Sequence, residues 1–156
     1  MKIFERILAA TDFSPASQPA LDEAERLARE CGARLTILHA FQVPALASVP
    51  EAPPGVYPPS LYDDFARAVR ASGEKRLESA VAHSRAGGID AHGLLREGLP
   101  DEEILAAADS EKADLLVLGT HGRRGPSRLL LGSVAARVVC RATRPVMTVR
   151  APTDSR

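Results

Sequence analysis

The sequence predicts an α/β protein built on a single parallel β-sheet, because segments typical of buried strands alternate along the chain with segments typical of helices. The run 115–118 is short, apolar and uninterrupted, as strands buried on both faces usually are. Between such runs, apolar residues recur at intervals of three and four, the period of a helix packed on a sheet. The length of 156 residues suits one domain. We expect this domain to cover residues 1–150 and a flexible tail to cover 151–156.

The first part of the chain reads as strand, helix, strand. Residues 3–10 have the pattern of a strand, and Ser14 followed by Pro15 is a favourable start for a helix. Gly32 is a suitable residue to end that helix, and a second buried strand is expected over 35–40. The helix carries an apolar stripe of Ala20, Leu21, Ala24, Leu27 and Ala28.

Residues 41–60 hold six of the chain's 12 prolines, which excludes a regular helix or a central strand. We expect a long loop there, either a lid over a site or a solvated excursion. A helix follows over 61–85, weakened at Gly73, and then a strand over 89–97. Acidic residues at 101–103 suit the first turn of a third helix. The last elements are a helix that begins at 132–133 and a strand from Pro145 to Val149.

The stretch that follows the strand 115–118 contains the pattern Gly119-x2-Gly122-x9-Gly132-Ser133. Glycines let the backbone approach a ligand, and a helix that begins at Gly132-Ser133 offers free N–H groups to an anion. The spacing fits neither a P-loop nor the dinucleotide fingerprint. The alternative is a flexible loop whose glycines only form turns.

This pattern resembles the nucleotide-binding signature of the universal stress protein family, in its ATP-binding branch. Further stretches are similar to that family's landmarks and occur in the same order: Ala10-Thr11-Asp12-Phe13-Ser14, Leu38-His39-Ala40, Gly98-x-Pro100 and Arg144-Pro145-Val146. The resemblance implies a five-stranded parallel sheet of order 3-2-1-4-5, of the adenine-nucleotide alpha-hydrolase-like kind, with helices on both faces. Asp12 and Gly119 would then meet at the topological switch point, where open α/β sheets bind ligands.

The resemblance also implies the residues of a nucleotide site. Asp12 would accept a hydrogen bond from the adenosine moiety, although an Asx-type turn is the alternative role. Ser133 would add its hydroxyl to the helix start or cap that helix, and His121 would bind phosphate or hold the loop. No catalytic residue and no metal ligands can be assigned. The predicted binding residues are Ala10, Thr11, Asp12, Ala40, Leu118, Gly119, Thr120, His121, Gly122, Gly132, Ser133 and Val134.

By resemblance, the protein would be a dimeric sensor or regulator in a stress response that binds ATP, with Mg²⁺ as an optional companion, and has at most weak ATPase activity. The edge strand from Pro145 to Val149 would join two copies, and an unidentified signalling protein would read the bound state. Two other functions stay open. One is an interaction module of the same fold without nucleotide, and the other is an ATP-hydrolysing or adenylyl-transferring enzyme.

Composition limits the other possibilities. The chain has 20 Lys and Arg against 20 Asp and Glu, and only 4% of its residues are aromatic. This argues against a nucleic-acid binder or a binder of anionic membranes. Cys31 and Cys140 fall in helical patterns and are expected to be buried thiols in a reducing compartment. With no signal peptide and no long apolar run, a cytoplasmic location is expected.

Overall fold

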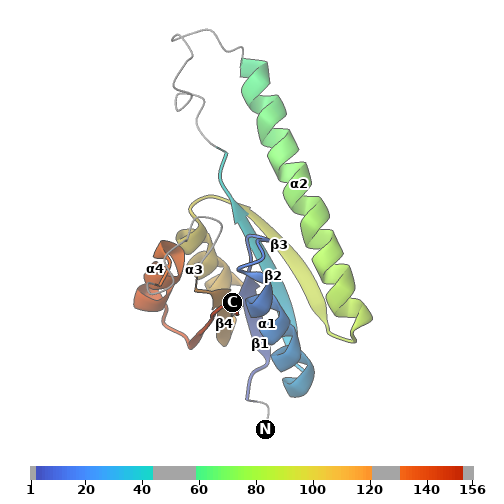
Figure 1. Ribbon diagram of the computed structural model, residues 1–156, viewed down its shortest axis with the longest axis vertical. Coiled ribbons are helices and arrows are strands. Elements are labelled where there is room, and N and C mark those ends of the chain that lie inside the picture. The colour runs from blue at the N-terminus through green and yellow to red at the C-terminus, as the bar shows by residue number, and fades with distance from the viewer. Residues whose placement is uncertain (1–2, 44–58, 121–130, 153–156) are drawn as a thin grey trace.

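The computed structural model describes residues 3–43, 59–120 and 131–152, and the chain alternates strands with helices throughout this part (Figure 1). The predicted class, α/β, is confirmed. The loop expected over 41–60 and the expected tail fall mostly outside the described residues. The elements are β1 (Arg6–Ala10), α1 (Gln18–Cys31), β2 (Arg34–Phe41), α2 (Pro59–Ala86), β3 (Ala91–Glu97), α3 (Pro100–Ser110), β4 (Leu115–Gly119), α4 (Ser133–Arg141) and β5 (Val146–Val149).

The five strands form one parallel sheet in the order β3-β2-β1-β4-β5, as the resemblance implies. Strand β1 is central and pairs with β2 on one side and with β4 on the other. In register, Ala10 at the end of β1 lies beside Leu38 of β2 and beside Leu118 of β4. The switch point of the topology therefore lies between β1 and β4, at the carboxyl ends of both strands.

Helices cover the two faces of this sheet. Helices α1 and α2 pack on one face, where Ala24, Ile37 and Val117 are among the fully buried residues. Helices α3 and α4 pack on the other face around Leu8, Leu116 and Val138. Alternate residues of each central strand feed the two clusters, as expected for strands buried on both sides. Both layers keep the ends of β1 and β4 in fixed positions.

The start of α1 is where the sequence prediction was wrong. Ser14 and Pro15 do not begin the helix, because the chain first makes a turn in which the N–H groups of Ser17 and Gln18 both donate to the Ser14 carbonyl (3.1 and 3.2 Å). Ser17 occupies the N-cap position without a side-chain capping bond, and a proline lies in the first turn. At the other end Gly32 adopts the left-handed conformation (φ 61°), as predicted.

Helix α2 is longer than predicted and runs through Gly73 without interruption. A Cβ atom at Gly73 would lie 3.1 Å from Leu95 Cδ1 and 3.2 Å from His39 Cδ2, so glycine allows the helix to approach the sheet closely. Gly73 thus has a packing role, and the helix does not break there. In Figure 1, the first turns of α2 extend beyond the end of the sheet, where Leu61 and Phe65 are exposed.

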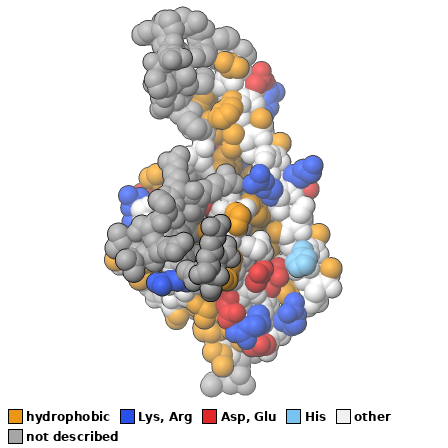
Figure 2. Space-filling view, viewed as in Figure 1, with side chains coloured by type: hydrophobic (Ala, Val, Ile, Leu, Met, Phe, Trp, Pro, Cys, Tyr) orange, Lys and Arg blue, Asp and Glu red, His pale blue; other side chains and the backbone are white. Residues whose placement is uncertain are grey.

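The surface matches the neutral charge balance of the sequence. On the face seen in Figure 2, basic and acidic side chains are interspersed over the described surface. Cys140 is exposed and Cys31 half-buried, so the expectation of two buried thiols was wrong; Cys140 lies on the outer side of α4. None of the helices in the described part of the chain is both long and apolar enough to cross a membrane.

Candidate functional site

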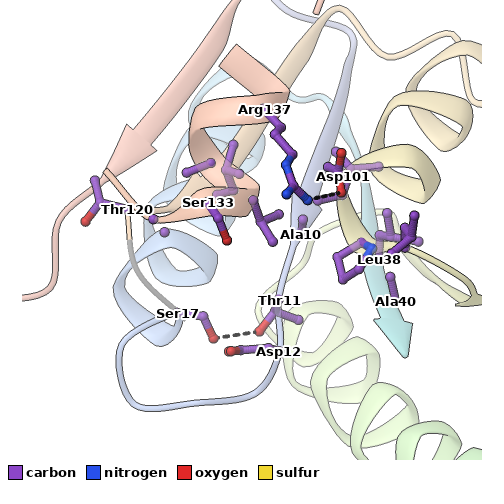
Figure 3. Close-up of a pocket in the computed structure, with 18 of the residues that line it drawn as sticks. Ala10, Thr11, Asp12, Ser17, Leu38, Ala40, Asp101, Thr120, Ser133 and Arg137 are labelled. Atoms are coloured by element: carbon purple, nitrogen blue, oxygen red, sulfur yellow. Dashed lines mark hydrogen bonds and ion pairs between the residues drawn. The ribbon is translucent and has the colours of Figure 1, made fainter. Parts of the chain in front are cut away.

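A cavity of about 580 Å³ opens at the switch point, within the usual size range of small-molecule sites. Ten of the twelve predicted binding residues line it. His121 and Gly122 lie outside the described residues, as do Arg123, Arg124 and Arg128 beside them. In Figure 3, Thr120 and Ser133 lie on one side of the cavity and Ala40 on the other. The ten come from four separate stretches of the chain: Ala10, Thr11, Asp12, Ala40, Leu118, Gly119, Thr120, Gly132, Ser133 and Val134.

The turn after β1 forms one wall and is held by its own polar groups. Thr11 Oγ1 accepts a hydrogen bond from the Phe13 N–H (3.0 Å) and pairs with Ser17 Oγ (3.0 Å). Asp12 Oδ1 accepts from the Ser14 N–H (2.9 Å), which is the Asx-type turn that the sequence left as an alternative role. Asp12 also lines the cavity, so the turn fixes the position of a carboxylate that a ligand can reach.

His39 supports this wall from behind, because its own side chain does not line the cavity. The side chain is buried, its Nδ1 is 2.9 Å from the Thr11 carbonyl oxygen, and its ring lies 4.8 Å from that of Phe13. His39 therefore ties the turn after β1 to β2. Leu38 and Ala40, on either side of it, face the cavity.

The opposite wall is the end of β4 together with the start of α4. Gly132 occupies the N-cap position, with φ −59° and ψ 155°, and its N–H donates to the Thr120 carbonyl (2.6 Å). No side chain caps this helix, so Ser133 is its first residue and not its cap. The first turn of α4 presents Ser133, Val134 and Ala135 to the cavity. A helix start of this kind attracts an anion through its backbone N–H groups and its dipole.

Sequence reasoning missed a pair of charged residues in the lining, Asp101 and Arg137. Asp101 lies in the first turn of α3 and is buried; Arg137 Nη1 is 3.5 Å from its Oδ1, and Arg141 Nη1 is 3.3 Å from its Oδ2. The acid was read only as a favourable charge at a helix start. Arg137 follows Ser133 by four residues, one helical turn, and that spacing was the available signal. The other missed lining residues are Ser17, Leu38, Gln42, Leu99, Pro100, Ile104 and Ala135.

The described lining contains few titratable side chains. In the described part of the chain, no three His, Cys, Asp or Glu residues group closely enough to hold a metal ion. The described lining likewise contains no histidine or cysteine that could act with Asp12 as a base or a nucleophile. It combines apolar side chains, among them Leu38, Leu99 and Ile104, with the polar start of α4 and the charged pair Asp101 and Arg137. An amphiphilic ligand with one anionic end fits this distribution.

The fold and the cavity define an open α/β protein with a ligand-sized crevice at its switch point. The sequence model of the universal stress protein family matches residues 3–150. The chain is 35% identical over 149 residues to universal stress protein YxiE of Bacillus subtilis, and the aligned region covers 95% of this chain and 100% of that relative. It is 30% identical over 150 residues to universal stress protein MJ0531 of Methanocaldococcus jannaschii, and the aligned region covers 96% of this chain and 84% of that relative. The chain belongs to the universal stress protein family.

Solved structures share the fold. Protein MJ0577 of Methanocaldococcus jannaschii superposes with a TM-score of 0.82 at 22% identity, covering 97% of this chain and 99% of that one. A universal stress protein in complex with cAMP gives a TM-score of 0.64 at 27% identity, covering 96% and 98%. A universal stress protein from Archaeoglobus fulgidus in complex with dAMP gives 0.61 at 22% identity, covering 96% and 100%. Proteins of this family thus include ones that bind adenine nucleotides.

Proposed function

We propose that this protein binds an adenine nucleotide, ATP in the first place, in the cavity between the ends of β1 and β4. The observation that carries the proposal is the convergence of two distant motifs on one cavity, the turn Thr11–Asp12 and the helix start Gly132–Ser133. The polar helix start suits the phosphates, and Ala40 with the apolar lining residues suits the base. The cAMP and dAMP complexes of relatives support the same ligand class.

Magnesium would enter with the phosphates and not through a site built by the protein. Asp12 and Asp101 are the carboxylates of the described lining, and Asp101 is already paired with two arginines. Asp12 lines the cavity beside the start of α1 and would approach a phosphate-bound Mg²⁺ through water. The protein itself would orient the nucleotide, shield its base from water and offer hydrogen-bond donors to its anionic end.

As a regulator, the protein would act as a homodimer whose surface changes when nucleotide binds. Strand β5 is at the edge of the sheet and pairs with β4 on one side. Pairing with β5 of a second copy would cover its other side, since open strand edges are commonly covered or paired. Sedimentation over a range of concentrations tests this, and a stable monomer at micromolar concentration would rule the dimer out.

The first experiment is to purify the protein, denature it and identify any released nucleotide. The stripped protein is then titrated calorimetrically with ATP, AMP and cAMP, with and without Mg²⁺. Released adenine nucleotide, or saturable heat with ATP, would support the proposal. No nucleotide and no heat at millimolar ATP would overturn it and favour an interaction module that works without nucleotide. Turnover of ATP measured alongside would show whether any hydrolysis accompanies binding.

A further inference from the structure

Arg137 is the one cationic side chain in the described lining of the cavity. It lies one turn after Ser133 on α4, and its side chain is 60% exposed, which leaves it room to move. Figure 3 shows its guanidinium directed toward Asp101, in the space between Ser133 and Leu38. An arginine at this position is within the same cavity as the helix start that we assign to phosphate.

Asp101, the partner of Arg137, is in contact with two arginines although one would balance its charge. Asp101 is only 5% exposed, and a carboxylate so deeply buried requires a counterion. It has two, because Arg141 contacts its other oxygen. Arg141 does not line the cavity, whereas Arg137 does. One arginine is enough to balance one carboxylate, so Arg137 can leave Asp101 without stranding a buried charge.

We propose that Arg137 binds the phosphate group of the nucleotide, and that Asp101 competes with that phosphate for it. In the free protein, Asp101 holds Arg137 across the gap between α3 and α4. When a phosphate arrives, Arg137 turns to it, and Arg141 keeps Asp101 neutralised. The pair then sets how strongly the cavity prefers a charged nucleotide to a neutral nucleoside. This inference rests on the proposed adenine-nucleotide function.

The test compares ATP with adenosine, which shares the base and ribose but has no charge. Arg137→Gln should weaken ATP binding about tenfold, the value of one charge-assisted hydrogen bond, and change adenosine binding less than about twofold. Arg144→Gln is the matched control. Arg144 also makes an ion pair with α3, at 2.6 Å to Asp109, but lies outside the cavity lining. It should change neither affinity.

Asp101→Asn should change the affinity for ATP in the opposite direction to Arg137→Gln. It keeps the shape of the side chain and removes the competing charge, so ATP should bind about threefold more tightly and adenosine unchanged. The melting temperature of each variant reports folding, and Arg137→Gln alone tests the proposal if Asp101→Asn does not fold. Equal losses for ATP and adenosine, or no loss for either, would overturn the role of Arg137. Weaker ATP binding in folded Asp101→Asn would overturn the competition.

These outcomes stay separate from the proposed function. A wild-type protein that binds ATP and adenosine while Arg137→Gln matches it would leave the nucleotide function standing and reject Arg137 as the phosphate contact. A wild-type protein that binds neither would reject the nucleotide function itself, and this inference with it.

Discussion

Strands β1 and β4 are neighbours along their whole length, yet their two ends are built in different ways. At the amino ends the chain segments bond to each other: the Asp114 carboxylate accepts from the N–H of Glu5 (2.8 Å) and of Arg6 (3.2 Å), and the Asp114 N–H donates to the Arg6 carbonyl (2.9 Å). At the carboxyl ends each segment instead forms its hydrogen bond with the strand on its other side, away from the switch point. The Thr11 N–H donates to Leu38 of β2 (2.9 Å), and the Thr120 N–H donates to Val149 of β5 (3.0 Å).

The difference shows how the topology produces a cavity without weakening the sheet. The connections that leave β1 and β4 run to helices on opposite faces of the sheet, so the two segments separate at the carboxyl ends of these strands. Each is then held by its outer neighbour, Thr11 by β2 and Thr120 by β5. We therefore expect substitutions at the amino ends to change stability and substitutions at the carboxyl ends to change binding.

The largest effect is expected for Gly132→Val. Gly132 lines the cavity at the start of α4, where a phosphate must approach, so valine should crowd the phosphate and ATP affinity should fall at least a hundredfold, about 2.7 kcal/mol. The φ of −59° suits any residue, so the free energy of unfolding should fall by less than about 1 kcal/mol, the cost of a poorer N-cap. Calorimetric titration and urea unfolding measure the two. Gly132→Ala should be intermediate, and wild-type affinity in the valine variant would contradict the placement of the phosphates.

Asp114→Ala tests the opposite end. It removes a carboxylate that accepts from two backbone N–H groups of another segment, and the free energy of unfolding should fall by about 2 kcal/mol. ATP affinity should stay within about twofold of wild type, because the cavity lies at the far end of the strands. Asp109→Ala, on an exposed aspartate at the end of α3, is the control and should cost much less. A loss of binding with no loss of stability would break the comparison.

The sequence allowed the fold to be predicted because its signals are local and repeated. The apolar run 115–118, the stripe on α1 and the stop at Gly32 each depend on residues a few positions apart, and the strand order came from the resemblance. The contacts that depend on distant residues were missed. Asp101 meets Arg137 and Arg141 only after α3 and α4 pack. The start predicted at Ser14–Pro15 was wrong because the chain first makes a turn that closes on the Ser14 carbonyl, and the pairing of Ser17 with Thr11 holds that turn.

Ser17→Ala sharpens the comparison, because Ser17 is a structural residue at the binding end. Its buried hydroxyl pairs with Thr11 Oγ1 (3.0 Å) and donates to the Ser14 carbonyl (3.0 Å). Its loss should lower the free energy of unfolding by about 1 kcal/mol and weaken ATP binding about threefold, since the turn that positions Asp12 loosens. Ser110→Ala is the control, because that hydroxyl bonds only within its own helix among the described contacts. An unchanged ATP affinity would show that Asp12 is positioned without this turn.

The smallest effect on stability is expected on α1, away from both ends of strands β1 and β4. On α1, hydrogen bonds from Arg26 hold the pKa of Glu23 below its ordinary value of 4.5. A carboxyl whose pKa is lowered by folding stabilises the native state above its unfolded pKa and loses that contribution as the pH falls through its folded pKa. Glu23→Gln should therefore cost about 0.3 kcal/mol at pH 7, as exposed helical pairs do, and the difference from wild type should shrink as the pH falls below 4.5 and through the lowered pKa of Glu23. Urea unfolding of both proteins between pH 7 and pH 3 measures this. A difference as large at pH 3 as at pH 7 would mean that Glu23 contributes through packing. The surface pair would then not be a suitable reference for the effects at the two strand ends.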